Sequence, residues 1–226
     1  MLKLPFYYAD RVRVNHQHFV DLKRSLGVEL SGRRTIVVGS APNPIFPADI
    51  GDRYVCVNGS VHSLIRHQQR SPDITLLNGT IVTDDRAYAT ATREVLRGNA
   101  LGHVLVQYAD LDQTRSFLSD QNNRFLSLEG YNIIERRLII GDVLGVNWWG
   151  TYKSSMSISL GIFSVLLCLW CGAESVHMVG FSLNDEHEYG NGRILTPRRH
   201  IQSDKSVVQR LIALKLPVTT STDDFF

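Results

Sequence analysis

The segment that decides the fold reads Val37-Val-Gly-Ser-Ala-Pro-Asn-Pro44. Together with Thr35 and Ile36 it forms a β-branched apolar run that stops abruptly at glycine, serine and proline, which is typical of a buried strand entering a turn. In open α/β sheets, ligands bind where such strands end. The turn lacks the G-x-G-x-x-G and Walker patterns, which argues against a standard dinucleotide or ATP loop. It is consistent with a nucleotide-binding loop or with an ordinary strand exit.

Similar apolar runs recur along the chain with helical patterns between them, and this alternation predicts βαβ units. We therefore predict an α/β, Rossmann-like fold with a predominantly parallel sheet and helices on both faces. The strands are expected at Thr35–Val38, Tyr54–Val57, Ile74–Leu77, His103–Val106, Ser175–Val179 and Val218–Thr220.

The helices are predicted from apolar residues at helical spacing, beginning with Phe19, Leu22 and Leu26 near the start of the chain. The others are expected at Val61–Gln69, Asp85–Arg97, Thr114–Ser119, Met156–Cys171 and Ser203–Lys215. The stretch 121–150 has the least regular pattern and is interpreted as a loop-rich insertion or lid. Residues 1–226 are expected to form a single domain.

Composition excludes several classes of protein. The 226 residues are 43% hydrophobic and 20% charged, which fits a globular domain and not a disordered or fibrous chain. A formal net charge of +2 gives no indication of a nucleic-acid partner. The start of the chain lacks a signal-peptide pattern, and the longest apolar stretch is short for a membrane span. We expect a cytoplasmic protein, with peripheral association at the inner face of a membrane left open.

The three cysteines, Cys56, Cys168 and Cys171, lie within apolar stretches. An odd number of cysteines in a chain of this length indicates no disulfide framework, and the C-x-x-C pair has no further ligands that would complete a zinc site. We interpret all of them as core residues in a protein from a reducing compartment.

Two further strands end in Asn-Gly, at Asn58-Gly59 and Asn78-Gly79. An asparagine side chain offers a donor and an acceptor together, which suits bases, riboses and phosphates. Because parallel strands end at the same edge of a sheet, we predict that Asn58 and Asn78 contribute to a binding site there. The alternative is that Asn-Gly serves only as a favoured turn pair.

The segment Thr196-Pro-Arg-Arg-His200-Ile-Gln-Ser-Asp204 precedes the last helix, for which Ser203 is the expected N-cap. The partial positive charge of a helix N-terminus, with Arg198 and Arg199, would keep an imidazole neutral and able to act as a general base. Asp204 could instead pair with His200 and raise its pKa. The sequence alone leaves these alternatives open.

The order of these motifs resembles the bacterial sialyltransferase family, which uses CMP-activated sugars. Over residues 34–224 the similarity joins the first loop, Asn58, Asn78, a helix start at Ser159-Leu-Gly161, the segment Gly172-Ala-Glu-Ser-Val-His-Met-Val-Gly-Phe-Ser182, and His200 with Asp204. The chain is also similar to the related Kdo transferases and to proteins of the pterin-pyrophosphokinase type that share the first loop.

The resemblance implies a role for each matching residue. His200 falls where the family has its general base, and Tyr189 is the nearest match to its tyrosines beside the leaving phosphate. Ser40 replaces an asparagine of the family and Ala41 its second glycine. The residues that would hold CMP are Gly39, Ser40, Asn43, Asn58, Asn78, Ser159 and Gly161.

The implied activity is inverting transfer of a sialic acid, a related nonulosonate or Kdo from a CMP-sugar to a glycan hydroxyl, in polysaccharide biosynthesis. Such a reaction needs a base on the acceptor and donors for the departing phosphate, which Tyr189, Arg198 or Arg199 would supply, and it requires no cofactor or metal. A solvated basic pair is the alternative for the arginines. Two other functions stay open: an ATP-dependent, pyrophosphokinase-like enzyme, and a non-catalytic nucleotide- or glycan-binding module.

Overall fold

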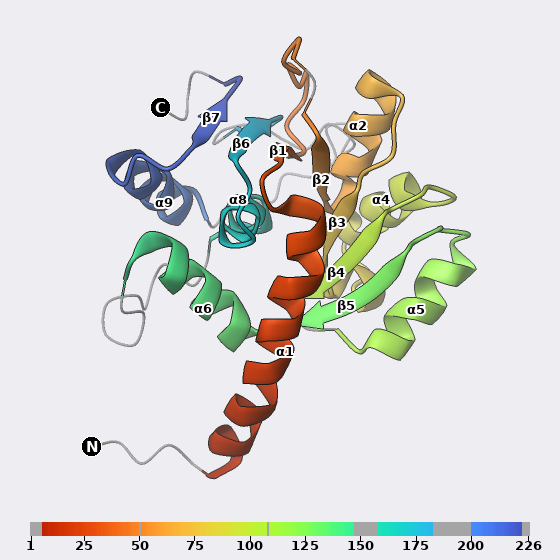
Figure 1. Cartoon of the computed structure of the whole chain (residues 1–226). Coiled ribbons are helices and arrows are strands. Elements are labelled where there is room, and N and C mark those ends of the chain that lie inside the picture. Colours follow the sequence, from red (N-terminus) through yellow and green to blue (C-terminus); the bar gives the residue numbers. More distant parts are fainter. Residues whose placement is uncertain (1–5, 50, 108, 147–157, 183–199, 223–226) are drawn as a thin grey trace.

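The strands of the chain form one parallel sheet with the order β5-β4-β3-β2-β1-β6-β7, shown in Figure 1. The computed structural model describes residues 6–49, 51–107, 109–146, 158–182 and 200–222, with side chains from Gln17 onward. Within these ranges the seven strands are β1 (Arg34–Val38), β2 (Arg53–Val57), β3 (Ile74–Asn78), β4 (His103–Gln107), β5 (Ser127–Tyr131), β6 (Ser175–Val179) and β7 (Val218–Thr220).

The helices connect successive strands, as the alternation of patterns predicted. They are α1 (Phe6–Leu30), the short 3₁₀ turn η1 (Asn58–Ser60), α2 (Val61–Gln68), α3 (Thr80–Thr83), α4 (Ala87–Leu96), α5 (Leu111–Asp120), α6 (Ile133–Leu144), α8 (Leu160–Trp170) and α9 (Ile201–Ala213). No helix in the described part of the chain is long and apolar enough to cross a membrane.

Strand β1 lies between β2 and β6, with Val37 opposite Val55 on one side and Met178 on the other. Both faces of this strand are covered, since Ile36, Val37 and Val38 are at most 2% exposed. Parallel strands buried on both faces read as continuous apolar runs. This explains why the sequence pattern located them well.

Helices cover both faces of the sheet, as predicted. On one face α1, α6, α8 and α9 pack on a core that includes Leu26, Phe163 and Val208. On the other face, α2, α3, α4 and α5 cover a second core that includes Leu64 and Leu118. The predicted Rossmann-like α/β class is therefore confirmed.

The interpretation of residues 121–150 as loop-rich is wrong for the residues that the structure describes, because β5 and α6 lie in this stretch. Strand β5 is an edge strand containing Glu129 and Gly130, which weaken its apolar alternation. Helix α6 buries Glu135 and Arg136, so its inner face is not purely apolar. A capping box formed by Asn132 and Glu135 starts this helix.

Two predicted helix starts also differ from the structure. Helix α8 begins at Leu160, not at Met156, since Ser159 caps it by accepting a hydrogen bond from the Ile162 N–H. Helix α9 begins at Ile201, so Ser203 lies within it and is not its N-cap. The Asp204 N–H already donates to the His200 carbonyl at 2.8 Å, which makes His200 the N-cap residue.

The three cysteines are buried, as predicted, and none forms a disulfide. Burial raises the pKa of each thiol, for Cys171 to about 12. A neutral, buried thiol is a poor nucleophile. All three cysteines are therefore core residues.

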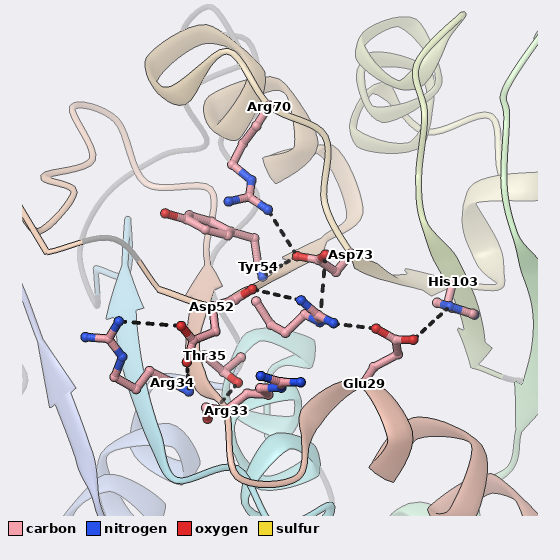
Figure 2. A network of polar contacts seen from close by, with 10 residues as sticks. Glu29, Arg33, Arg34, Thr35, Asp52, Tyr54, Arg70, Asp73 and His103 are labelled. Atoms are coloured by element: carbon pink, nitrogen blue, oxygen red, sulfur yellow. Dashed lines mark hydrogen bonds and ion pairs between the residues drawn. The ribbon is translucent and has the colours of Figure 1, made fainter.

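Charged side chains gather at the amino ends of the parallel strands (Figure 2). The Arg53 Nε donates to Glu29 at 3.1 Å and lies 3.9 Å from Asp73, while His103 Nε2 lies 3.8 Å from Glu29. These residues lie at or just before the starts of β2, β3 and β4, next to the end of α1. The network connects α1 to the amino ends of the strands.

Replacing Asp73 by alanine should lower the free energy of unfolding by about 1–3 kcal/mol. Its carboxylate accepts the Tyr54 N–H at 2.8 Å, and Tyr54 is 1% exposed, so the substitution leaves a buried donor without its acceptor. Denaturant unfolding of the variant measures the change. Asp49→Ala is the control, because the Asp49 side chain is 82% exposed and its ion pair with Arg34 should contribute little. Equal stability of the two variants would contradict the expectation.

Candidate functional site

The order of the strands singles out one position at the carboxyl edge of the sheet. From β1 to β5 the chain proceeds in one direction across the sheet, and β6 and β7 then lie on the other side of β1. Open α/β sheets bind ligands outside the strand ends at such a switch point. The candidate site is therefore the region where the segments after β1 and β6 meet.

These two segments approach each other closely. The Gly39 N–H donates to the Val179 carbonyl at 2.7 Å, and the Ala41 N–H donates to the Gly180 carbonyl at 2.8 Å. A Cβ added at Gly39 would lie 2.4 Å from the Gly180 oxygen. The glycine in the first loop is therefore required by contact between two backbones, whatever else binds there.

The ring of Phe181 fills the space beside the first loop. A Cβ at Gly39 would lie 3.0 Å from one ring carbon of Phe181, and a Cβ at Gly161 would lie 2.9 Å from another. Phe181 is 8% exposed. Gly39 and Gly161, which the resemblance placed against CMP, thus both lie against this ring. The sequence pattern did not identify Phe181 as a residue of the site.

The beginnings of α8 and α9 are joined by a hydrogen bond. The Ser159 N–H donates to Asp204 Oδ1 at 2.8 Å, and Asp204 is 8% exposed. Because Asp204 lies in the first turn of α9, this bond brings the turn that starts with His200 to the start of α8. The sequence left open whether Asp204 pairs with His200. In the structure the Asp204 carboxylate accepts a hydrogen bond from the Ser159 backbone.

A buried arginine also holds the start of α8. Arg136 Nη2 donates to the Ile158 carbonyl at 2.6 Å and to the Ser159 carbonyl at 3.3 Å, and Nη1 contacts Gln107 Oε1 at the end of β4. Arg136 is 5% exposed, and its guanidinium lies 4.7 Å from the Phe163 ring centre. Sequence reasoning missed it, because an arginine within an irregular stretch gives no signal of burial.

The two strand-end asparagines lie together, as the sequence predicted. The Asn78 N–H donates to Asn58 Oδ1 at 2.9 Å, and the Asn58 side-chain amide donates to the Tyr88 hydroxyl. Asn78 Oδ1 in turn accepts from the Thr80 N–H at 3.1 Å. Asn58 therefore shapes the strand ends, while the Asn78 amide nitrogen still has N–H donors to offer a ligand.

A depression of about 350 Å³, a volume that includes open solvent, lies at the ends of β1, β6 and β7. Asn43, whose φ of 53° is left-handed, is one of its lining residues. Ser40 is half-buried and comes just before the first lining residue, Ala41. The other lining residues are Ala41, Pro42, Pro44, Ile45, Gly180, Phe181, Ser182, Ser221 and Thr222.

Three predicted residues, Tyr189, Arg198 and Arg199, lie outside the described residues. Within the described ranges, no group of three or more histidine, cysteine, aspartate or glutamate side chains is arranged to hold a metal ion. The structure thus brings Gly39, Gly161, Ser159 and the turn of His200 to the same edge of the sheet, with Asn58 and Asn78 farther along that edge.

Two solved structures are similar to this chain. One is the monofunctional α-2,3-sialyltransferase Cst-I from Campylobacter jejuni, with a TM-score of 0.49 and 12% identity, covering 85% of this chain and 77% of that chain. The other is the sialyltransferase Cst-II in complex with a trisaccharide acceptor and CMP, with a TM-score of 0.49 and 10% identity, covering 83% and 80%. No family model matches the chain, and no curated protein matches it.

Substituting Gly39 with alanine should destabilise the protein by about 2 kcal/mol or more, since the new methyl group would meet the Gly180 carbonyl, which belongs to the backbone. Gly27→Ala is the matched control, because its Cβ would have no neighbour closer than 4.0 Å and alanine favours the α1 helix. Thermal and denaturant unfolding compare the two variants. A Gly39→Ala variant as stable as Gly27→Ala would show that the two loops separate easily.

Proposed function

We propose that this chain is an inverting glycosyltransferase that moves a sialic acid, a related nonulosonate or Kdo from a CMP-sugar to a glycan hydroxyl. The observation that carries the proposal is the hydrogen bond from the Ser159 N–H to Asp204, which brings the turn of His200 to the start of α8. That helix start meets the loops after β1 and β6 through the ring of Phe181. This arrangement supports the proposal, because it puts the turn of His200 on the same side of the sheet as the strand ends.

The chemistry requires little more than these parts. Departure of CMP from a ketose passes through an oxocarbenium-like state, and the phosphate is already a good leaving group. The protein must hold the donor, take a proton from the acceptor hydroxyl and stabilise the charge that develops on the phosphate. His200 would take that proton at an imidazole nitrogen.

The start of α8 is suited to the departing phosphate. The first N–H groups of a helix have no partners within the helix and carry partial positive charge. Arg136 adds a full positive charge, fixed by its bonds to the Ile158 and Ser159 carbonyls. The Ser159 hydroxyl accepts from the Ile162 N–H and keeps its own proton to donate. Tyr189, Arg198 and Arg199 are proposed to add further donors.

The nucleotide would lie along the strand ends. Gly39 and Gly161 support it indirectly, because the ring of Phe181 occupies the space between them. Direct contacts are assigned to Ser40, Asn43 and the amide of Asn78, with Asn58 holding Asn78 in place. This assignment requires no metal ion and no cofactor.

Calorimetric titration of the purified protein with CMP, CDP, UDP and ATP, each with and without Mg²⁺, tests the donor class. We expect CMP to bind selectively and to bind equally well in EDTA. ATP binding that requires Mg²⁺, without a response to CMP, would instead favour phosphoryl transfer by a pyrophosphokinase-like enzyme. CMP binding without release of CMP from any CMP-sugar would favour a non-catalytic module.

Replacing His200 by alanine should lower turnover of a CMP-sugar by at least about 10²-fold, while CMP affinity stays within a few fold. The loss is expected in kcat because the imidazole acts on the acceptor proton. His67→Ala is the control, since His67 is exposed in the last turn of α2, away from the carboxyl ends of the strands. A His200→Ala variant as active as the His67→Ala variant would remove His200 from the mechanism.

A further inference from the structure

The depression at the ends of β1, β6 and β7 is distinct from the start of α8, where the proposed transfer occurs. None of the described residues that line it carries a charged side chain. Its wall combines the apolar surfaces of Pro42, Pro44 and Ile45 with the hydroxyl and amide groups of Asn43, Ser182, Ser221 and Thr222.

One of the lining hydroxyls is held in place by a histidine. His177 Nε2 lies 2.7 Å from Ser221 Oγ, and His177 Nδ1 lies 2.8 Å from Thr219 Oγ1. His177 and Thr219 are paired across β6 and β7, and the Ser221 N–H donates to the Met178 carbonyl. Ser221 is thus fixed both by its backbone and by its side chain.

The imidazole determines what the Ser221 hydroxyl can offer a ligand. Partial burial lowers the pKa of His177, which favours the neutral ring. In a neutral ring one nitrogen donates and the other accepts. In either tautomer Ser221 keeps hydrogen-bonding capacity that the imidazole does not use.

This chemistry matches a sugar better than it matches an ion or an apolar ligand. The C–H faces of a sugar ring pack on aliphatic surfaces, and its hydroxyl groups both donate and accept hydrogen bonds, as serine, threonine and asparagine side chains do. A charged ligand would need an opposite charge, which the described lining lacks.

We propose that this depression is a subsite for one uncharged sugar residue of the glycan acceptor, with Ser221 as a contact residue and His177 as the residue that positions it. The acceptor role rests on the proposed glycosyltransferase function, whereas sugar binding itself does not. The loops after β1 and β6 form part of its lining, and Phe181, which also lies against Gly161, connects it to the start of α8.

The chain contains a matched pair for comparison. His103 Nδ1 lies 2.9 Å from Ser127 Oγ and joins β4 to β5, just as His177, in the middle of β6, contacts Ser221, the residue after β7. This second pair lies at the amino edge of the sheet, where Figure 2 shows His103 beside Glu29, and Ser127 does not line the depression. This pair therefore serves as a control outside the depression.

The test is titration of the full ¹⁵N-labelled chain with methyl glucoside, methyl galactoside and methyl N-acetylglucosaminide. We expect at least one of them to cause saturable shifts at the amides of Ser182, Ser221 and Thr222. Ser221→Ala should weaken that binding about 3- to 10-fold, the effect of losing one hydrogen bond, while Ser127→Ala leaves it within twofold. Thr222→Ala, which removes another hydroxyl group of the lining, is the second variant and should also weaken binding.

Absence of saturable shifts at these amides with all three glycosides would overturn the proposal. Equal weakening by Ser221→Ala and Ser127→Ala would also overturn it, since the effect would then be structural. A separate CMP titration distinguishes the two proposals. Glycoside shifts without CMP binding would leave the sugar subsite and remove the transferase function, whereas CMP binding without glycoside shifts would remove only the subsite.

Discussion

The close approach of the backbone after β1 to the backbone after β6 is the constraint on which the candidate site depends. Two hydrogen bonds join these segments, at Gly39 and at Ala41, and no side chain fits at position 39. The contact lies at the point where the strand order reverses. It also leaves beside it the space that the Phe181 ring fills, and so determines how the start of α8 packs.

The two edges of the sheet have different physical characters. At the amino edge, charged groups pair with each other, as Glu29, Arg53 and Asp73 do, and link α1 to the strands. At the carboxyl edge, the polar groups that line the depression are neutral amides and hydroxyls among the described residues, while Arg136 and Asp204 hold the start of α8. Charges that are satisfied locally stabilise the fold, whereas neutral groups with spare hydrogen-bonding capacity suit binding.

Much of the fold could be predicted because its strands are buried on both sides. The runs around Val37 and Leu76 are apolar throughout, and only a parallel sheet with two covered faces requires this. Strand β5 and helix α6 escaped prediction for the opposite reason. An edge strand tolerates Glu129, and α6 buries Glu135 and Arg136 with partners that are distant in the sequence.

The sequence by itself determined the fold class, the edge at which polar groups collect and the chemical types of the candidate residues, because burial and turn chemistry are local properties of a pattern. Only the tertiary structure decided how those residues are used. It placed Phe181 against Gly39 and Gly161, formed a hydrogen bond between Asp204 and the Ser159 N–H, and brought His177 into contact with Ser221. Each of these contacts is made between segments that lie apart in the chain, so side-chain packing and hydrogen-bond geometry select the partner, and no local pattern records that choice.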